Sequence, residues 1–442
     1  MSKPFASLSV AIVGAGPAGF YTAQALADLA PDARIDIIDR LPTPFGLIRY
    51  GVAPDHQETK KIQELFESIA LLPQIDFVGN IEIGKDITLA ELRECYDAVV
   101  LAYGVPHDAE LGIPGETLPG VYGAARFVGW YNGHPDQADL RPRLGKPGAI
   151  VIGNGNVAID IARLLSKSQA ELEHSDIAPY ALEQIGRAAP GDVHIVGRRG
   201  PAQAKFTTDE LTELGRLEQA VAVVDAEDIP ARLDDGLSMK DKRIKTRNLE
   251  CFRAYAQSDP AGRSRRIHFR FYLRPHAILG NDCVEGVRFE RVAVSDGSSA
   301  GTGEMLDIPC STVISAIGYR ACALNGVELS AAGNCLRNDE GRIDSGLYVV
   351  GWLRRGPSGK IGTNRADGES VAQRIQQEVE PGRSAGRAGL ERLVRARNLS
   401  PVDFPGWKRI ETFERANAPT AAVRRKMTRI SEMLDVSRAL PT

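Results

Sequence analysis

The sequence is poor in features that mark several classes of protein. Only six of its 442 residues are cysteines and no two stand as C-x-x-C, so a dithiol redox pair, a zinc ribbon and a ferredoxin-type cluster all lack their local signature. No apolar run reaches the length of a helix that crosses a bilayer. The net charge is only −3, which argues against nucleic acid as a general partner. We therefore expect no metal site, no membrane segment and no nucleic-acid partner.

Little sequence precedes the first predicted strand. "MSKPFASLSVAIVG" runs almost directly into it, so we expect no signal or transit peptide. Together with isolated thiols, this start predicts a reducing cytoplasm. Glycine, by contrast, is abundant at 44 residues, which indicates close approaches between the backbone and a ligand. The length is too great for one core and predicts two domains.

The first strong pattern reads strand, glycine turn, helix, strand across residues 8–40, "LSVAIVGAGPAGFYTAQALADLAPDARIDIIDR". In its motif, Gly14 permits a tight turn, Gly16 lets a pyrophosphate approach, and Gly19 lets the helix pack close to the strand. The phosphates of a dinucleotide then lie at the positive end of the helix. Asp39, at the end of the second strand, offers acceptors to ribose hydroxyls. The pattern predicts a dinucleotide site, and the alternative is a set of turn glycines without a ligand.

A second such unit begins at "GAIVIGNGNVAIDIARLL" and closes with "DVHIVGRRG", after an inserted helix and loop at 166–190. Its motif is Gly153-x-Gly155-x-x-Ala158, and its closing strand ends in Arg198 and Arg199. A carboxylate at that point would repel a 2′-phosphate, whereas two guanidiniums bind it with charge-assisted hydrogen bonds. This predicts NADP(H) rather than NAD(H). The alternative is a surface arginine pair that binds a neighbouring carboxylate.

The order of the remaining strands predicts the domain organisation. "YDAVVLAYGVP" and "CSTVISAIGYR" end where the chain would pass between domains, and "GLYVVGWLRRGPSG" is a last strand that leads into a helix. We predict an α/β fold of two Rossmann-like dinucleotide-binding domains, the second inserted into the first. The first domain comprises residues 1–104 and 322–442, and the inserted domain comprises 105–321.

The tail from 381 to 442 differs in charge from the rest of the chain. It holds thirteen Lys or Arg against six Asp or Glu, so the first 380 residues carry a net charge of −10. Such an asymmetry can orient a charged partner by its field. The alternative is a set of solvated helical faces.

One dinucleotide pocket with an acidic end and one with a basic end predict two different cofactors. FAD in the first and NADPH/NADP+ in the second is the simplest assignment. A flavin lets a two-electron hydride donor serve a partner that takes electrons one at a time.

Three longer stretches carry a resemblance to a known family. They are "PFGLIRYGVAPDH" (44–56), "RRGPAQAKFTTDEL" (198–211) and "GWLRRGPSGKIGTN" (351–364), in this order along the chain. Together they resemble the adrenodoxin reductase-like ferredoxin–NADP+ reductases. The resemblance implies bound FAD, NADPH as the hydride donor and an acidic 2Fe–2S ferredoxin as the electron acceptor. Running in reverse, to make NADPH, is also open.

The resemblance also implies roles for single residues. Phe45, Gly46 and Leu47 match residues that lie along the flavin, and Trp352 matches an aromatic residue beside its ring. His56 and Glu210 match a polar pair near the nicotinamide. The predicted FAD set is Gly14, Gly16, Ala18, Gly19, Asp39, Arg40, Phe45, Gly46, Leu47, Gly104, Trp352, Gly359, Lys360 and Ile361. The predicted NADP set is Gly153, Asn154, Gly155, Asn156, Val157, Arg198, Arg199, Glu210 and Gly359.

Residue chemistry leaves alternatives open at several of these positions. Trp352 could be a core residue, and His56 a hydrogen-bonded loop histidine. Glu210 could be a first-turn helix acid, with Thr208 as the cap. Hydride transfer needs alignment more than an acid or base, so His56 and Glu210 are interpreted as positioning and proton-supply residues. Lys360 either reinforces the positive field of the amides that open the next helix, or is simply exposed.

Two basic stretches, 240–247 and 263–270, lie in the inserted domain. An acidic ferredoxin needs such a face, and we predict that it docks on Lys242, Arg243, Lys245 and Arg247. The alternatives are RNA, for which stacking aromatics are sparse, and a solvated loop. We expect a monomer. Rival functions are an electron-transfer subunit similar to the small subunit of glutamate synthase, and a nucleotide-sensing protein without turnover.

Overall fold

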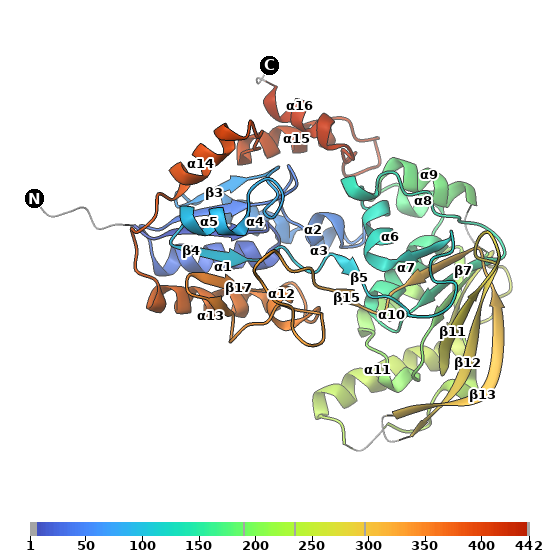
Figure 1. The fold of residues 1–442 in the computed structure, drawn as a ribbon. Coiled ribbons are helices and arrows are strands. Elements are labelled where there is room, and N and C mark those ends of the chain that lie inside the picture. The colour runs from blue at the N-terminus through green and yellow to red at the C-terminus, as the bar shows by residue number, and fades with distance from the viewer. Residues whose placement is uncertain (1–6, 189–190, 234–235, 296–297, 440–442) are drawn as a thin grey trace, which may run out of the picture. The chain divides into compact units, whose positions relative to one another are not determined.

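The computed structural model describes residues 7–188, 191–233, 236–295 and 298–439 (Figure 1). It divides into two compact units. Unit 1 comprises Met1–His107, Asn132–Ala138 and Tyr319–Thr442, and unit 2 comprises Asp108–Tyr131 and Asp139–Gly318. The predicted α/β fold with two Rossmann-like domains, one inserted into the other, is confirmed. The sequence had indicated borders after 104 and before 322, and no pattern indicated that 132–138 belongs with unit 1.

Unit 1 is built on a six-stranded sheet in the order β16-β17-β4-β1-β2-β3. All neighbouring strands are parallel except β16 and β17. The carboxyl ends of the parallel strands therefore lie along one edge, where a doubly wound sheet binds its ligands. The strands are β1 (Ser9–Val13), β2 (Arg34–Ile38), β3 (Ile75–Val78), β4 (Ala98–Leu101), β16 (Arg342–Asp344) and β17 (Leu347–Val349).

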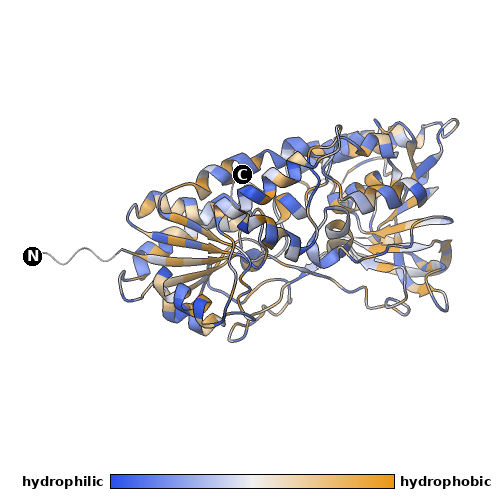
Figure 2. Cartoon of the chain, turned by 90° about the horizontal axis from the view of Figure 1, so that it is seen from above, coloured by the Kyte–Doolittle hydropathy of each residue, from blue (hydrophilic) through white to orange (hydrophobic). Residues whose placement is uncertain are grey.

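Both faces of this sheet are buried, because alternate residues of β1 enter two separate cores. Val10 and Ile12 pack in a core with α1 (Pro17–Leu29) and α13 (Thr363–Glu378), whereas Ala11 and Val13 pack in a core with α5 (Leu89–Cys95) and α14 (Arg387–Ala396). This is why the strand reads as a continuous apolar run rather than an alternation. Figure 2 shows the same contrast, with strands mostly hydrophobic and helices striped.

Helices of unit 1 cover both faces of the sheet. The last three helices of the unit belong to the basic tail, residues 381–442. Arg387 pairs with Asp36, Arg397 with Glu91 and Lys408 with Glu67, so part of the tail's positive charge is neutralised within unit 1. The helices are α1 (Pro17–Leu29), α2 (Leu47–Tyr50), α3 (Gln57–Lys60), α4 (Ile62–Ala70), α5 (Leu89–Cys95), α12 (Trp352–Arg355), α13 (Thr363–Glu378), α14 (Arg387–Ala396), α15 (Phe404–Ala416) and α16 (Ile430–Arg438), with a 3-10 turn at Pro135–Gln137.

Unit 2 holds a second six-stranded sheet, in the order β6-β14-β7-β8-β10-β9, and all its strands are parallel. A three-stranded antiparallel sheet, β11-β12-β13, completes the unit. The strands are β6 (Val121–Gly123), β7 (Gly148–Ile152), β8 (Asp192–Val196), β9 (Ala220–Val224), β10 (Arg265–Arg270), β11 (Leu273–Leu279), β12 (Gly286–Ser295), β13 (Ser298–Pro309) and β14 (Thr312–Ser315). Two short strands, β5 (His107–Asp108) and β15 (Tyr319–Arg320), stand at the borders of the units.

The helices of unit 2 include the predicted insertion, which forms two short helices rather than one. They are α6 (Ala124–Tyr131), α7 (Asn156–Ser166), α8 (Gln169–Leu172), α9 (Pro179–Ala188), α10 (Thr208–Leu214) and α11 (Met239–Ala256), with 3-10 turns at Pro201–Gln203 and Ala226–Asp228. In the part of the chain that the structure describes, no helix combines the length and apolar character needed to span a membrane.

The two basic stretches have different structures. Residues 240–247 form the N-terminal half of α11 and are not a loop. Residues 263–270 lead into β10, an inner strand of the parallel sheet, where Arg265 donates to the carbonyl of Lys167 and Arg270 pairs with Asp225 at 2.8 Å. The cations of the second stretch are thus bound to the protein itself.

Candidate cofactor sites

The first glycine turn requires glycine at two of its three positions. Gly14 has a φ of +118°, and a Cβ there would lie 2.5 Å from the carbonyl oxygen of Ala102. A Cβ on Gly19 would lie 2.1 Å from the carbonyl oxygen of Gly14. A Cβ on Gly16 would meet no atom within 4 Å, so this residue faces open space at the start of α1. No side chain caps that helix, which leaves its first amides available to a pyrophosphate.

Asp39 fixes this turn through both of its carboxylate oxygens. One accepts from the amide of Ala15 at 2.8 Å and the other from the amide of Leu41 at 2.9 Å. Burial raises the pKa of Asp39 despite these two bonds. A carboxylate has about four lone-pair positions, so Asp39 keeps capacity for the predicted ribose hydroxyls while it holds the turn.

A second turn, at Phe45 and Gly46, lies against the first. Phe45 has a φ of +81° and Gly46 a φ of +47°, and the Phe45 amide donates to the carbonyl of Ala15 at 2.7 Å. A Cβ on Gly46 would lie 3.1 Å from the Cα of Gly16. The ring of Phe45 is fully buried in the core, whereas the side chain of Leu47 is 50% exposed. The main chain of this turn and Leu47, and not the ring of Phe45, are thus free to face a flavin.

Trp352 starts α12 at the carboxyl end of β17, on the same edge of the sheet. The preceding Gly351 has a φ of +69°, and a Cβ there would lie 2.7 Å from the Cβ of Ala18, so the two segments touch. The Trp352 indole donates to the carbonyl of Ser358 at 3.0 Å, and its ring stacks on Tyr319 with centroids 5.6 Å apart. Trp352 is partly exposed at the border of the core, and not one of its fully buried residues.

The loop before α13 presents main-chain donors. The Lys360 amide donates to the hydroxyl of Thr363 at 3.1 Å, while the amides of Ile361 and Gly362 have no acceptor among the described residues. Gly359 has a φ of +85°, and the side chain of Lys360 is exposed. The positive end of α13 is therefore open to an acceptor such as the pyrimidine edge of a flavin.

Arg40 is engaged by the protein. It pairs with Asp136 at 2.7 Å and lies 3.4 Å from His134, both in the 132–138 segment of unit 1. Burial opposes the charge of Arg40, but Asp136 outweighs it and raises the pKa of the guanidinium. Another predicted residue, Gly104, has a φ of +77°, and a Cβ there would meet nothing within 4 Å. Sequence reasoning missed His134 and Asp136, because no local motif marks the segment.

The glycine turn of unit 2 has the same geometry as the Gly14–Gly19 turn of unit 1. A Cβ on Gly153, whose φ is +150°, would lie 2.3 Å from the carbonyl oxygen of Ala316, and a Cβ on Gly155 would meet nothing within 4 Å. Ala158 is fully buried, and its amide donates to the carbonyl of Gly155 at 2.9 Å. The methyl group of alanine is accommodated where the first unit requires glycine.

Two asparagines tie the loop after β8 to this turn. Asn154 donates to the carbonyl of Arg199 at 3.2 Å and accepts at its own carbonyl from the amide of Lys205 at 2.8 Å. Asn156 accepts from the amide of Thr207 at 2.9 Å. Val157, in the first turn of α7, is partly exposed. These bonds fix the arginine loop beside the open start of α7.

Arg198 and Arg199 are both exposed, and neither pairs with a carboxylate among the described residues. The interpretation as a surface pair on a neighbouring carboxylate therefore finds no partner in this part of the chain. Two free guanidiniums stand where the first unit has Asp39, which suits a 2′-phosphate.

The predicted polar pair is divided between the units. His56 is the residue before α3 in unit 1, and Glu210 lies in the first turn of α10 in unit 2. The prediction of Thr208 as a cap is wrong: Thr207 precedes the helix, and the Thr208 hydroxyl donates to Asn248 at 2.7 Å. Asp209 and Glu210 in the first turn suit the positive end of the helix, which is the alternative reading of Glu210.

Comparisons with known proteins agree with this geometry. Residues 8–228 match the model of the pyridine nucleotide-disulphide oxidoreductase family. The chain is 40% identical to the mitochondrial NADPH:adrenodoxin oxidoreductase of Arabidopsis thaliana, over 92% of this chain and 90% of that protein. It is 38% identical to the NADPH-ferredoxin reductase FprA of Mycobacterium tuberculosis, over 97% and 98%. The structure of that FprA in complex with NADPH superimposes with a TM-score of 0.92, at 37% identity, over 98% of this chain and all of that one.

Proposed function

The chain belongs to the family of NADPH:adrenodoxin and NADPH–ferredoxin oxidoreductases, and we propose that it oxidises NADPH and delivers the electrons singly to a small iron–sulfur protein. It is an oxidoreductase whose cofactors are FAD and NADP(H). Bound FAD would supply the conversion between a two-electron hydride donor and a one-electron acceptor.

The chain's own residues bind and orient these cofactors. In unit 1 the open start of α1 at Gly16 and the amides before α13 would hold the pyrophosphate and the pyrimidine edge of FAD. In unit 2 the open start of α7 at Gly155 and the guanidiniums of Arg198 and Arg199 would hold NADP(H). His56 and Glu210 stay predictions as positioning and proton-supply residues.

One observation carries this assignment: two strand–turn–helix–strand units of the same build end in opposite charges. Asp39 follows β2, and Arg198 with Arg199 follows β8. A carboxylate accepts from ribose hydroxyls, and guanidiniums bind a 2′-phosphate, so the two units suit different dinucleotides. The test is an assay of the purified protein with NADPH and cytochrome c. We expect a yellow protein that reduces cytochrome c only when a 2Fe–2S ferredoxin is added, and a colourless protein that binds no FAD would overturn the proposal.

A ferredoxin as partner follows from the names of the relatives, and the exposed face of α11 is its proposed docking surface. This basic face consists of the predicted residues Lys242, Arg243, Lys245 and Arg247 and the neighbouring Lys240; all are exposed except Lys245, which is half-buried. Most of it lines a hollow of about 1030 Å³, together with Met239 and Ile244, whose side chains are 85% and 39% exposed. Glu250 is the acidic residue among those that line the hollow, and cations outnumber it four to one. Exposed apolar side chains among cations suit an acidic protein surface.

The basic face is not explained by the stability of α11. Lys240 and Lys242 lie near the positive end of the helix, where a cation is unfavourable. Arg243 and Arg247 are four residues apart, and like charges at this spacing destabilise a helix. None of the five cations of the basic face forms an ion pair with a carboxylate within the described part of the chain. A role in binding a partner accounts for charges that the helix itself disfavours.

Two further properties stay predictions. We propose that the protein acts as a monomer and in the cytoplasm, whereas the plant relative is named as mitochondrial.

A further inference from the structure

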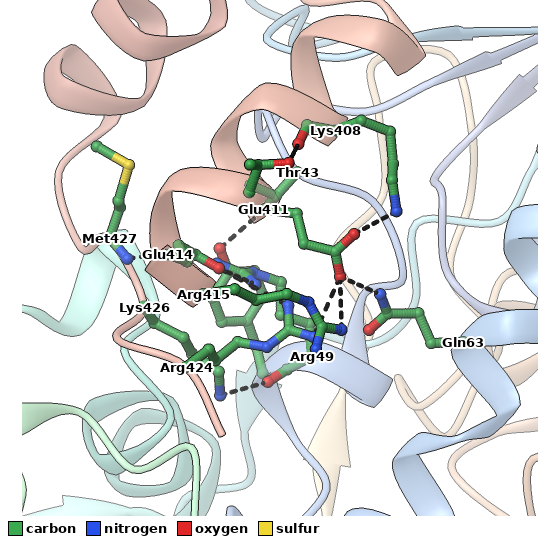
Figure 3. Close-up of polar contacts among 12 residues, drawn as sticks. Thr43, Arg49, Gln63, Lys408, Glu411, Glu414, Arg415, Arg424, Lys426 and Met427 are labelled. Carbon is green, nitrogen blue, oxygen red and sulfur yellow. Dashed lines mark hydrogen bonds and ion pairs between the residues drawn. The ribbon is translucent and has the colours of Figure 1, made fainter. Parts of the chain in front are cut away.

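A buried ion pair joins the C-terminal tail to the segment that is proposed to face the flavin. Arg49 lies in α2, two residues after Leu47 of the 45–47 turn, and its side chain is 2% exposed. Both of its terminal nitrogens donate to Glu414 of α15, at 3.0 and 2.5 Å, and Glu414 is fully buried (Figure 3). Such a bidentate contact fixes the direction of the guanidinium as well as its charge.

The same arginine is held on its other sides by aromatic rings. Its guanidinium carbon lies 5.1 Å from the ring centre of Trp407 and 5.0 Å from that of Tyr50. Trp407 is fully buried in α15, and its ring also meets that of Phe45 edge to face, with centroids 5.9 Å apart. One tryptophan of the tail therefore contacts both Phe45, in the strained turn, and the arginine that follows it.

The main chain of α2 is bound as well. Lys426 donates to the carbonyl oxygen of Arg49 at 3.0 Å, and the neighbouring amide of Met427 donates to Glu414 at 2.8 Å. Burial opposes the charge of Arg49, but Glu414 outweighs it and raises the pKa of the guanidinium, so it stays charged. Both ends of the tail segment 407–427 thus converge on one residue of α2.

The 45–47 turn has a backbone conformation that is unfavourable on its own. Phe45 has a φ of +81°, which is unfavourable for a residue with a Cβ and persists only where its surroundings impose it. Gly46 lies against Gly16, at the open start of α1 where the pyrophosphate is expected. A shift of α2 would move the turn away from both the pyrophosphate and the flavin.

We propose that Glu414 and Trp407 are positioning residues for FAD: the tail clamps Arg49 and Phe45 and so holds the 45–47 turn in the conformation that receives the flavin. This inference rests on the proposed function, because it presupposes that unit 1 binds FAD. It assigns the C-terminal helices a part in cofactor binding, although no residue of the 404–427 segment belongs to the glycine turns.

The test compares Glu414→Gln with Arg387→Gln in the full-length chain. Both variants break ion pairs between the tail and the rest of unit 1, but Arg387 binds Asp36 of β2 and Asp76 of β3, away from the 45–47 turn. The FAD dissociation constant of each apoprotein is measured by quenching of flavin fluorescence, and the melting temperature is recorded without FAD. We expect at least a tenfold weaker FAD affinity for Glu414→Gln and less than a threefold change for Arg387→Gln. A shifted visible flavin spectrum should accompany only the first.

A double variant, Arg49→Met with Glu414→Met, separates positioning from stability. Replacing a buried ion pair by apolar side chains often leaves stability unchanged, whereas removing one partner does not. Glu414 also lies 3.7 Å from the buried Arg424 and accepts from the Met427 amide. We therefore expect the double variant to melt at or above Glu414→Gln, though below the wild type, yet to retain the weakened FAD affinity. Wild-type affinity in the double variant, or equal losses in the Glu414 and Arg387 variants, would overturn the proposal. A wild-type chain that binds no FAD would instead overturn the proposed function.

Discussion

Asp39 and Arg198 occupy corresponding points of two similarly built units: Asp39 follows β2 by one residue, and Arg198 follows β8 by two. The carboxylate is bound by two backbone amides, while the guanidinium is exposed and pairs with no carboxylate among the described residues. We propose that the side chain after the strand gives the same backbone frame its selectivity, for a ribose hydroxyl in unit 1 and for a 2′-phosphate in unit 2.

Replacing both arginines, Arg198→Ala with Arg199→Ala, should raise the Michaelis constant for NADPH by about 10-fold or more, because losing even one charge-assisted bond costs about 1.5–3 kcal/mol. The constant for NADH should change little, since NADH has no 2′-phosphate. Steady-state kinetics with both nucleotides measures this, and Arg216→Ala, an exposed arginine elsewhere in unit 2, is the control. Equal effects on the two nucleotides would refute the 2′-phosphate assignment.

The open space at Gly16 predicts a variant that folds but binds FAD poorly. Gly16→Ala meets no protein atom and has a compatible φ of −89°, so the apoprotein should keep its melting temperature. The methyl group occupies the space expected for the pyrophosphate, so the FAD affinity should fall at least tenfold. Gly19→Ala, whose methyl group would lie 2.1 Å from a backbone oxygen, should instead fail to fold stably. An unchanged affinity of Gly16→Ala would place the pyrophosphate elsewhere.

Charge reversal on the basic face of α11 should act on one acceptor only. Lys242→Glu with Arg243→Glu should slow ferredoxin reduction at low salt by an order of magnitude or more, and added salt should reduce the difference, because ions screen the attraction. Ferricyanide reduction should be unaffected. Arg392→Glu with Arg395→Glu in α14 changes the net charge equally and serves as the control. The docking proposal fails if both acceptors, or both variants, are affected alike.

The stability of the tail should depend on pH through Glu411. Burial alone would raise the pKa of this carboxyl, but Lys408 and Arg424 outweigh it and lower the pKa to about 2 from an ordinary value of 4.5. A lowered folded pKa contributes stability that is present above pH 4.5 and is lost as the pH falls toward 2, by up to about 1.4 kcal/mol per pH unit. Denaturant unfolding from pH 5 down to pH 2 should show a steeper loss in the wild type than in Glu411→Gln. The exposed Glu432→Gln should follow the wild type, and identical slopes for the wild type and Glu411→Gln would contradict this account.

Local patterns predicted the parts of the fold that depend on local physics. The run Val10–Val13 predicts β1, and the residues that follow Gly14 predict α1. Both patterns depend only on the hydrophobic periodicity of neighbouring residues. The glycines were predictable for a similar reason. A Cβ at Gly14 or Gly19 would clash with backbone atoms of the turn itself or of the adjoining strand end.

Contacts between distant segments could not be predicted in this way. Arg49 and Glu414 are 365 positions apart, and nothing near either residue indicates its partner. The prediction that Phe45 lies along the flavin is untested, but the burial of its ring against Trp407, which lies 362 positions later, could not be read from the residues around it. The sequence did not show whether residues 240–247 form a helix or a loop. The apolar residues that bury α11, such as Leu249 and Phe252, lie beyond the basic stretch.

The central claim is that unit 1 carries FAD and unit 2 selects NADPH. It is tested most directly by rapid mixing of the oxidised protein with NADPH or NADH in the absence of oxygen, with the visible absorbance of the oxidised flavin as the signal. We expect NADPH to bleach the flavin at concentrations at which NADH has little effect, and this preference to disappear when Arg198 and Arg199 are both replaced by alanine. Bleaching by NADH at the same concentrations and rates in the wild type would contradict the account.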